Sequence, residues 1–158
     1  MWRDGQLGAR EGRPIVVRRR ARERDRAFLE EAHVAALGPI VLVGMGWTKE
    51  RLRQQFFREV TLAHCEVISV DGRDAGYVST VDRGAYWYID AIAIVPRYQR
   101  KGVGGAVLRA LLDDAAPRPV RLTVLRTNRA RGLYARLGFV VVAQDGQREL
   151  MEWRATAP

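Results

Sequence analysis

The sequence has few of the residues that build disulfide frameworks or metal centres. Its 158 residues include one cysteine, Cys65, and two histidines, His33 and His64. A single cysteine excludes an internal disulfide and is typical of a reducing cytoplasm. Its apolar neighbours predict a buried, inert thiol. Because the histidines lack metal-ligand spacing and the sequence has no Cys/His cluster, we expect no bound metal.

Long apolar runs are also missing. The longest candidate, residues 34–43, is interrupted by Gly38 and Pro39, and it is shorter than the roughly 18 residues that a membrane span needs. No hydrophobic region of the secretory type follows the charges near the N-terminus. We therefore expect a cytoplasmic protein without a membrane partner.

Three common catalytic fingerprints are absent as well. The sequence contains neither GxGxxG nor GxxxxGK(S/T), so a dinucleotide-binding fold or a P-loop kinase is not supported by its usual motif. It contains no GxSxG, and Ser69 and Ser79 fall in predicted strands, which argues against a serine nucleophile.

Lysine is scarce, whereas arginine is abundant. Of 27 basic residues only Lys49 and Lys101 are lysines, a bias that we attribute to genome composition, and the net charge is +9. Residues 1–26 hold nine arginines and four acidic residues, which is +5 of that charge. This stretch indicates either a solvated basic tail with an edge strand or an attraction for anionic partners. Because the sequence has no nucleic-acid motif, we do not expect a nucleic-acid partner.

The length and the order of patterns predict one mixed α/β domain with a largely antiparallel sheet. Residues 1–13 are predicted to be a flexible basic extension, and residues 14–158 a single domain. Asp25 is a plausible cap of a helix that ends at Gly38–Pro39, with a loop or short turn over residues 40–47, and Thr48 caps a second helix. The other expected elements are a first strand from residue 15, strands over 65–70, 76–81, 85–95, 120–125, 140–144 and 147–153, and helices from 103 and across 128–139.

The most informative segment runs from Tyr88 to Gly105, where an apolar strand is followed by basic residues and glycines. Apolar residues recur at helical spacing from Val103 onward, so the glycines precede or open a helix. The first N–H groups of a helix have no partner within it, and the positive end of the helix dipole lies behind them. The segment therefore predicts a phosphate site, with a plain glycine-rich turn as the alternative.

Two motifs in this half of the chain resemble those of the GCN5-related N-acetyltransferase (GNAT) superfamily. The segment Gln99-Arg100-Lys101-Gly102-Val103-Gly104 matches the acyl-CoA signature Gln/Arg-x-x-Gly-x-Gly/Ala. The segment from Asn128 to Phe139 contains Leu-Tyr-x-x-Leu-Gly-Phe, which is the more specific of the two. The resemblance is sharp over residues 86–153, loose over 14–85 and absent before that.

The resemblance implies a GNAT-type three-layer α/β/α domain around a mixed, strongly twisted sheet, and acetyl-CoA as co-substrate. It implies a wedge between the central strand and the strand after the glycine-opened helix, with a bulge in the central strand. The pantetheine arm would pair with the central strand, and Asn128 would bind the cofactor, cap its helix, or do both. The cofactor-binding residues expected on this basis are Ile92, Ala93, Ile94, Gln99, Arg100, Lys101, Gly102, Val103, Gly104, Gly105 and Asn128.

The resemblance also implies direct acetyl transfer to a primary amine, which reaches the site charged because its pKa is near ~10.4. Asp90 is the first candidate base, acting directly or through water, and a role in orienting substrate or pairing with an arginine is the alternative. Glu59 and Glu66 are further candidates. Tyr134 is the candidate acid for the CoA sulfur, with a packed aromatic ring as the alternative, and backbone N–H groups near Ile92 would polarise the thioester carbonyl.

Aromatic residues are the candidates for the acceptor pocket. Trp87 and Tyr88 come just before Asp90, and Phe56 on the second helix is the candidate for the opposite wall; core packing is the other interpretation. The acceptor would be a small-molecule or peptide amine. A CoA-binding regulatory module without turnover is the alternative function. A homodimer through a sheet edge, for instance the terminal strand ending at Trp153, is also possible.

Overall fold

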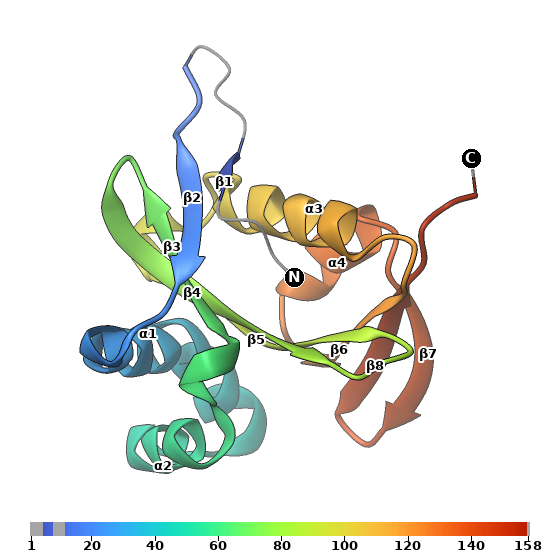
Figure 1. Ribbon diagram of the computed structural model, residues 1–158. Coiled ribbons are helices and arrows are strands. Elements are labelled where there is room, and N and C mark those ends of the chain that lie inside the picture. Colours follow the sequence, from blue (N-terminus) through green and yellow to red (C-terminus); the bar gives the residue numbers. More distant parts are fainter. Residues whose placement is uncertain (1–4, 8–11, 158) are drawn as a thin grey trace.

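The computed structural model describes residues 5–7 and 12–157, and it places eight strands in one sheet (Figure 1). The strand order is β1-β2-β3-β4-β5-β6-β8-β7, and among the described strands only β5 and β6 are parallel neighbours. The strands are β1 (Gly5–Leu7), β2 (Val16–Arg20), β3 (Cys65–Val70), β4 (Arg73–Asp82), β5 (Trp87–Ile94), β6 (Val120–Leu125), β7 (Val140–Asp145) and β8 (Arg148–Trp153).

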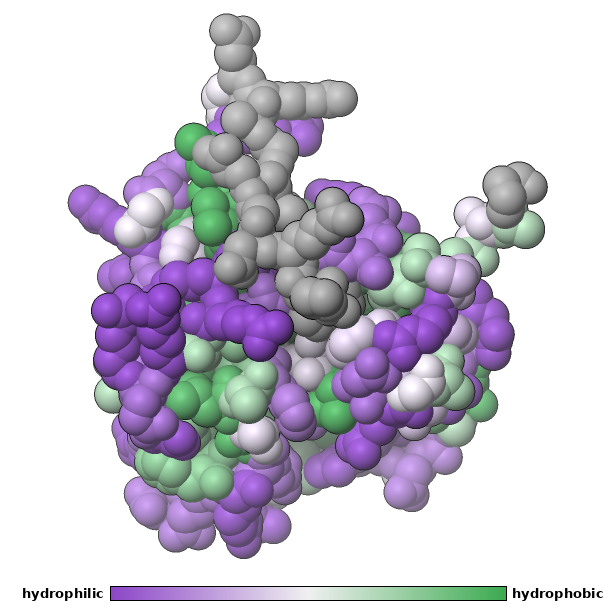
Figure 2. Space-filling model, viewed as in Figure 1, coloured by the Kyte–Doolittle hydropathy of each residue, from purple (hydrophilic) through white to green (hydrophobic). Residues whose placement is uncertain are grey.

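Helices cover both faces of this sheet, which confirms the three-layer α/β/α prediction. The larger core packs α3 (Val103–Ala115) and α4 (Ala130–Arg136) against one face, and a second cluster packs α1 (Arg26–Met45) and α2 (Lys49–Glu59) against the other. Short 3₁₀ turns are η1 (Glu23–Asp25), η2 (Leu62–His64) and η3 (Pro96–Tyr98). Figure 2 shows a largely hydrophilic face on which apolar residues gather over α1 and α2.

The first helix is longer than the sequence predicted. α1 continues through Pro39 and residues 40–45, and it ends at Gly46, whose φ of 65° suits glycine. A proline inside a helix costs about 3 kcal/mol, whereas burying one large aliphatic side chain gains about 1.5–3 kcal/mol. Val41, one turn beyond the expected end, is buried with Val34 and Leu52. Tertiary packing therefore offsets the proline, and the predicted loop is helical.

Asp25 also differs from its predicted role as a cap of α1. Its side chain makes no capping hydrogen bond to that helix. It accepts instead from the Arg22 backbone N–H at 2.8 Å and from both Arg19 Nη atoms at 2.8 and 2.9 Å. The Arg19 guanidinium holds the pKa of Asp25 at about 2, well below its usual value. Thr48, by contrast, caps α2 as predicted, with its hydroxyl accepting from the Arg51 N–H at 3.1 Å.

The segment Glu23–Met45 is long and apolar enough to cross a membrane by length and composition. Such a helix is weak evidence, because the core helix of a soluble protein passes the same test. One side of α1 is fully covered by the protein, with Leu29 and Ala32 at 0% exposure. The helix therefore serves as a core element of this domain.

The N-terminal segment departs from the predicted flexible extension in one place. Gly5–Leu7 forms β1 and pairs antiparallel with β2, while residues 1–4 and 8–11 of that extension lie outside the described residues. An open strand edge offers N–H and C=O groups to any extended segment, whatever its composition. The adjacent arginines have internal partners: Arg18 is buried 2.9 Å from Asp114, and Arg19 pairs with Asp25.

The edge of the sheet is not the strand that the sequence suggested. β8, which ends at Trp153, lies between β6 and β7, so β7 is the edge. All six residues of β7 are exposed, and Val140–Val142 form its apolar part.

At the start of β3, Cys65 is buried, as its apolar neighbours predicted. Burial raises the pKa of its thiol to about 11, which is consistent with an inert thiol.

The centre of the sheet opens into a wedge. β5 pairs with β6 only over Trp87–Ile89, and the two strands have no further paired residues toward their ends. The β4–β5 register shifts between Ser79, opposite Ala91, and Thr80, opposite Ile89, which leaves Asp90 as an extra residue in β5. Such an insertion is a β-bulge, which bends a strand. The wedge and the bulge agree with the expected architecture.

Candidate active site

The loop before α3 presents a row of backbone N–H groups. The first backbone hydrogen bond of this helix runs from the Ala106 N–H to the Gly102 carbonyl at 3.0 Å. Within the described chain, no backbone carbonyl therefore accepts a hydrogen bond from the N–H groups of residues 103–105. Arg100 and Gly102 both have positive φ, 59° and 78°, which turns the loop into a concave nest. This arrangement suits an anion such as a phosphate.

Side chains around the loop shape a groove of about 970 Å³. Gln99 donates from Nε2 to the Ile94 carbonyl at 2.8 Å and so ties the loop to the end of β5. Arg100 lines the groove, whereas Lys101 lies outside its lining, with Nζ 5.9 Å from the Tyr98 ring centroid. On the opposite side Val43 of α1 lines the groove while 89% exposed, so an apolar group bound there could cover it.

The backbone of β5 alternates between β4 and the wedge. The Val95 N–H donates to the carbonyl of Ala75, a residue of β4, at 2.9 Å. Because successive residues of a strand point their N–H and C=O groups to opposite sides, those of Ile92 and Ile94 face the wedge. Ala93, also expected to bind the cofactor, directs its backbone to β4, and its side chain is buried at 1% exposure. An extended ligand could therefore pair with Ile92 and Ile94, but not with Ala93.

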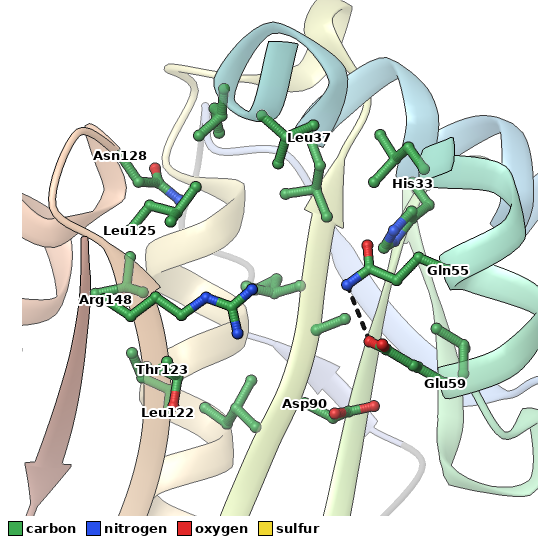
Figure 3. A pocket seen from close by; sticks show the side chains of 18 of the residues that line it. His33, Leu37, Gln55, Glu59, Asp90, Leu122, Thr123, Leu125, Asn128 and Arg148 are labelled. Atoms are coloured by element: carbon green, nitrogen blue, oxygen red, sulfur yellow. Dashed lines mark hydrogen bonds between the residues drawn. The ribbon is translucent and has the colours of Figure 1, made fainter. Parts of the chain in front are cut away.

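A second, smaller cavity of about 260 Å³ lies between α1, α2, β5 and β6 (Figure 3). It joins the larger groove at a set of shared residues, which are Leu37, Ile40, Ile92, Asn128 and Tyr134. The two cavities therefore form one continuous site, and the two candidate polar side chains of the second motif stand at the junction.

Tyr134 is held firmly at this junction. Its ring packs edge-on against Phe139 with 5.8 Å between centroids, and its side chain is buried. Burial raises the pKa of its phenol to about 12, so the group keeps its proton at any physiological pH. The ring is packed as an aromatic residue would be, and its hydroxyl carries a proton that it could donate, so the two interpretations of the sequence are compatible.

Asn128 uses one end of its amide to start α4. Its Oδ1 accepts from the Ala130 N–H at 2.9 Å, as capping asparagines do. The other end, Nδ2, makes no hydrogen bond within the described chain, and the residue lines both cavities. The amide can therefore cap the helix and donate to a ligand at the same time.

Two carboxylates enter the smaller cavity from neighbouring elements. The bulge in β5 places Asp90 there, and Glu59 projects from the end of α2 (Figure 3). Partial burial raises the pKa of Asp90, the charge of Glu59 raises it further, and His64 and Arg83 act in the opposite direction. Glu59 accepts from Gln55 Nε2 at 2.9 Å. Glu66, the third candidate base, is buried in β3 with an oxygen 3.6 Å from Arg18 and lies outside the cavity lining.

His33 is a member of this cavity that sequence reasoning missed. Its Nδ1 lies 2.6 Å from the Tyr77 hydroxyl, and burial lowers its pKa to about 4, with Gln55 acting in the opposite direction. The imidazole is therefore neutral at pH 7. Its position one helical turn after Leu29, on the apolar face, was the available signal. Within residues 12–157 no three His, Cys, Asp or Glu side chains form a group that could hold a metal ion.

Only one of the three predicted acceptor-pocket aromatics lines the cavity. Tyr88 does so, and its hydroxyl donates to Thr123 Oγ1 at 2.9 Å. Phe56 is buried against the sheet, with its ring centroid 5.4 Å from that of His33. Trp87 belongs to the α3 side, because neighbouring strand residues face opposite ways, and it lies under the Arg118 guanidinium.

A family model described as "Acetyltransferase (GNAT) domain" matches residues 44–153. The chain belongs to the GNAT acetyltransferase family. The GNAT protein is thus an acyltransferase, and acetyl-CoA is its co-substrate. No curated protein sequence matches the chain.

Solved structures share the GNAT fold at low sequence identity. The PaiA N-acetyltransferase of Thermoplasma acidophilum, solved in complex with coenzyme A, is 16% identical with a TM-score of 0.72, and the match covers 89% of this chain and 99% of that one. A GNAT acetyltransferase of Streptococcus agalactiae is 18% identical with a TM-score of 0.74, over 90% of this chain and 96% of that one. A GCN5-related N-acetyltransferase of Rhodopseudomonas palustris is 17% identical, with a TM-score of 0.72 over 94% and 99%.

Proposed function

We propose that the protein is a cytoplasmic N-acetyltransferase that acetylates the primary amine of a small molecule or peptide by direct attack in a ternary complex. The observation that carries this proposal is the junction of the two cavities at Tyr134, Asn128 and Ile92. One cavity has the features of an acyl-CoA groove, and the other has carboxylates for an amine. A transferred group would pass only across that junction.

Different residues of the groove would bind different parts of acetyl-CoA, which supplies an activated thioester. The N–H groups of residues 103–105 and the Arg100 side chain hold the phosphates. The free edge of β5 at Ile92 and Ile94 accepts the extended arm, as an added strand would be accepted. The glycine positions fit this role, because a Cβ built on Gly104 meets only Leu133, at 3.7 Å, and leaves the loop side open.

Asp90 in the smaller cavity and Tyr134 at the junction would transfer the protons of the reaction. The transfer forms an N–C bond and breaks the thioester C–S bond, while the ammonium group loses two protons. Asp90, with its raised pKa, passes one of them to solvent, directly or through a water. Tyr134 donates its hydroxyl proton to the departing sulfur, which leaves as the thiol of free CoA, and the second proton of the amine then restores the Tyr134 hydroxyl.

Two measurements test the proposal. Calorimetry should detect acetyl-CoA binding at micromolar affinity, with ATP binding much more weakly. Mass spectrometry of an amine panel should then detect products heavier by one acetyl group. Binding without acetylation of any amine would instead support the alternative, a regulatory module that holds acyl-CoA. If the folded protein does not bind acetyl-CoA, both the acetyltransferase and the regulatory module are excluded.

We also propose a homodimer that pairs through β7. The support is an open sheet edge whose residues are all exposed and include three consecutive valines. Sedimentation velocity on the wild type and on Val141→Glu tests this, because a charge in the interface should return the protein to monomers. A monomeric wild type at all concentrations contradicts it.

A further inference from the structure

The smaller cavity is electrically asymmetric. Asp90 and Glu59 enter it from β5 and α2, and neither makes an ion pair with another described residue. Arg148, the first residue of β8, enters from the opposite side (Figure 3). His33 is neutral at pH 7, so these three side chains set the charge of the cavity wall.

The position of Arg148 follows from the sheet register. Arg148 is the cross-strand partner of Leu125, a residue of the cluster on the α1–α2 side, so its side chain emerges on that side of the sheet. The next residue, Glu149, faces the other way and binds Arg131 at 2.7 Å and Arg126 at 3.7 Å. Arg148 also lies opposite Asp145 in the hairpin, but across residues 12–157 it makes no ion pair with that residue or any other.

An arginine without a protein carboxylate, facing a ligand cavity, suits a ligand carboxylate. Its planar guanidinium donates two parallel hydrogen bonds that match the two oxygens of one carboxylate. Apolar residues, among them Leu37 and Ile40, line the same cavity as Arg148 and the acidic pair. The wall therefore complements a short hydrocarbon chain with a cation at one end and an anion at the other.

We propose that the acceptor is a small aminocarboxylic acid, with its amine at Asp90 and Glu59 and its carboxylate at Arg148. This inference rests on the proposed N-acetyltransferase function and narrows the substrate class. The volume of about 260 Å³ lies below the range of about 300–1,000 Å³ of drug-sized sites, which favours a small molecule over a large one.

The test compares matched substrates on matched variants of the full chain. Each acceptor in a series with one to five methylenes between amine and carboxylate is paired with its primary amide, which has the same shape without the charge. The wild type should prefer the acid by about 5- to 50-fold in kcat/KM, at the lower end where solvent screens the exposed guanidinium. Arg148→Gln should abolish that preference and leave the neutral amides within about twofold.

The control variant is Arg20→Gln, which removes an exposed arginine of β2 outside both cavities and should keep the full preference. Equal use of acid and amide by the wild type would overturn the inference while leaving N-acetylation intact. Equal losses on both substrates in Arg148→Gln would assign the residue a structural role and overturn it as well.

A binding measurement separates this inference from the proposed function. With CoA bound, calorimetry should detect the aminocarboxylates in the wild type, and Arg148→Gln should weaken them by the same factor. If the acids bind in this way but no amine is acetylated, the catalytic proposal fails and the carboxylate site stands. If amides are acetylated but the acids bind no better than the amides, the carboxylate site fails alone.

Discussion

At the scale of single residues, the burial of Tyr134 decides what its hydroxyl can do. A phenol whose pKa is raised to about 12 stays protonated at physiological pH, so its hydroxyl can donate a proton but is not available as a base. The sulfur of CoA needs such a donor only as the thioester breaks, so the hydroxyl matters for turnover more than for binding.

Removing this hydroxyl gives the first prediction. Tyr134→Phe keeps the ring and its contact with Phe139, so affinity for acetyl-CoA and the melting temperature should stay close to those of the wild type. The turnover number should fall by about 10- to 100-fold, at or below the lower end of the roughly 10²- to 10⁴-fold range for a lost general acid, because a thiolate leaves readily. Steady-state kinetics and calorimetry check this. A parallel loss of affinity and stability would identify the ring as only a packing residue.

The pH profile tests Asp90. A base must be deprotonated, so activity should fall as the pH drops through the raised pKa of Asp90, an acid limb above the ordinary range for aspartate. Since Glu59 contributes to that rise, Glu59→Gln should move the limb of kcat/KM to lower pH. Asp90→Asn should remove the limb and most of the activity.

The same pKa also predicts the effect on stability. A raised folded-state pKa means that the charged carboxylate is disfavoured in the folded protein, so the group lowers stability at pH values above its ordinary pKa. Asp90→Asn should therefore leave the melting temperature at pH 7 unchanged or slightly higher. A strong loss of stability would show a structural role instead of a catalytic one.

At the scale of elements, local patterns predicted most of the strands, and β6 matches its predicted bounds of 120–125. They failed at α1, where Gly38 and Pro39 indicate a stop. The energy that overrides this signal comes from the packing of Val41 and Val34 with Leu52, which belongs to α2. Such contacts cannot be derived from one segment, so the acceptor-side helix was predicted too short.

The candidate site shows the same difference between local patterns and contacts between distant segments. Most residues of the loop before α3, and Asn128 and Tyr134 of the second motif, line the groove because their geometry is set by neighbours in sequence, as in Gln99 with Ile94; Lys101 is the exception. The acceptor cavity is assembled from elements that are far apart in the sequence, namely α1, α2, β5, β6, α4 and β8. His33 and Arg148 therefore went unpredicted, while Phe56 and Trp87 proved to be packed in the two core clusters.

The loop and the start of α3 give a prediction for one element. Gly104→Trp should fill the space in front of the free N–H groups and lower acetyl-CoA affinity by at least about 100-fold, because a large side chain takes the volume of a phosphate. Gly104→Ala is the matched control: its Cβ meets Leu133 at an ordinary 3.7 Å, so the fold is kept and the loss should be smaller. Calorimetry with melting curves measures both. Unchanged affinity in the tryptophan variant would exclude this phosphate site.

At the scale of the whole molecule, the wedge leaves two residues of β5, Ile92 and Ile94, paired with β4 but not with β6. We predict that the amide hydrogens of Ile92 and Ile94 exchange rapidly with solvent in the free protein and slowly with acetyl-CoA bound. Ala93 and Val95 are internal controls, because their N–H groups point to β4, as the Val95 bond to Ala75 at 2.9 Å demonstrates. Exchange measured by NMR should change at the first pair only. Equal protection at all four positions would place the ligand elsewhere.

The wedge also makes the stability of the folded protein depend on the concentration of acetyl-CoA. A ligand that binds only the folded state adds about 2.7 kcal/mol of stability when its concentration is a hundred times its Kd. The three paired positions between β5 and β6 are few for the centre of a sheet, so this part of the molecule gains most from being filled. In a cell that runs short of acetyl-CoA, the enzyme would become less active and also an easier target for proteases.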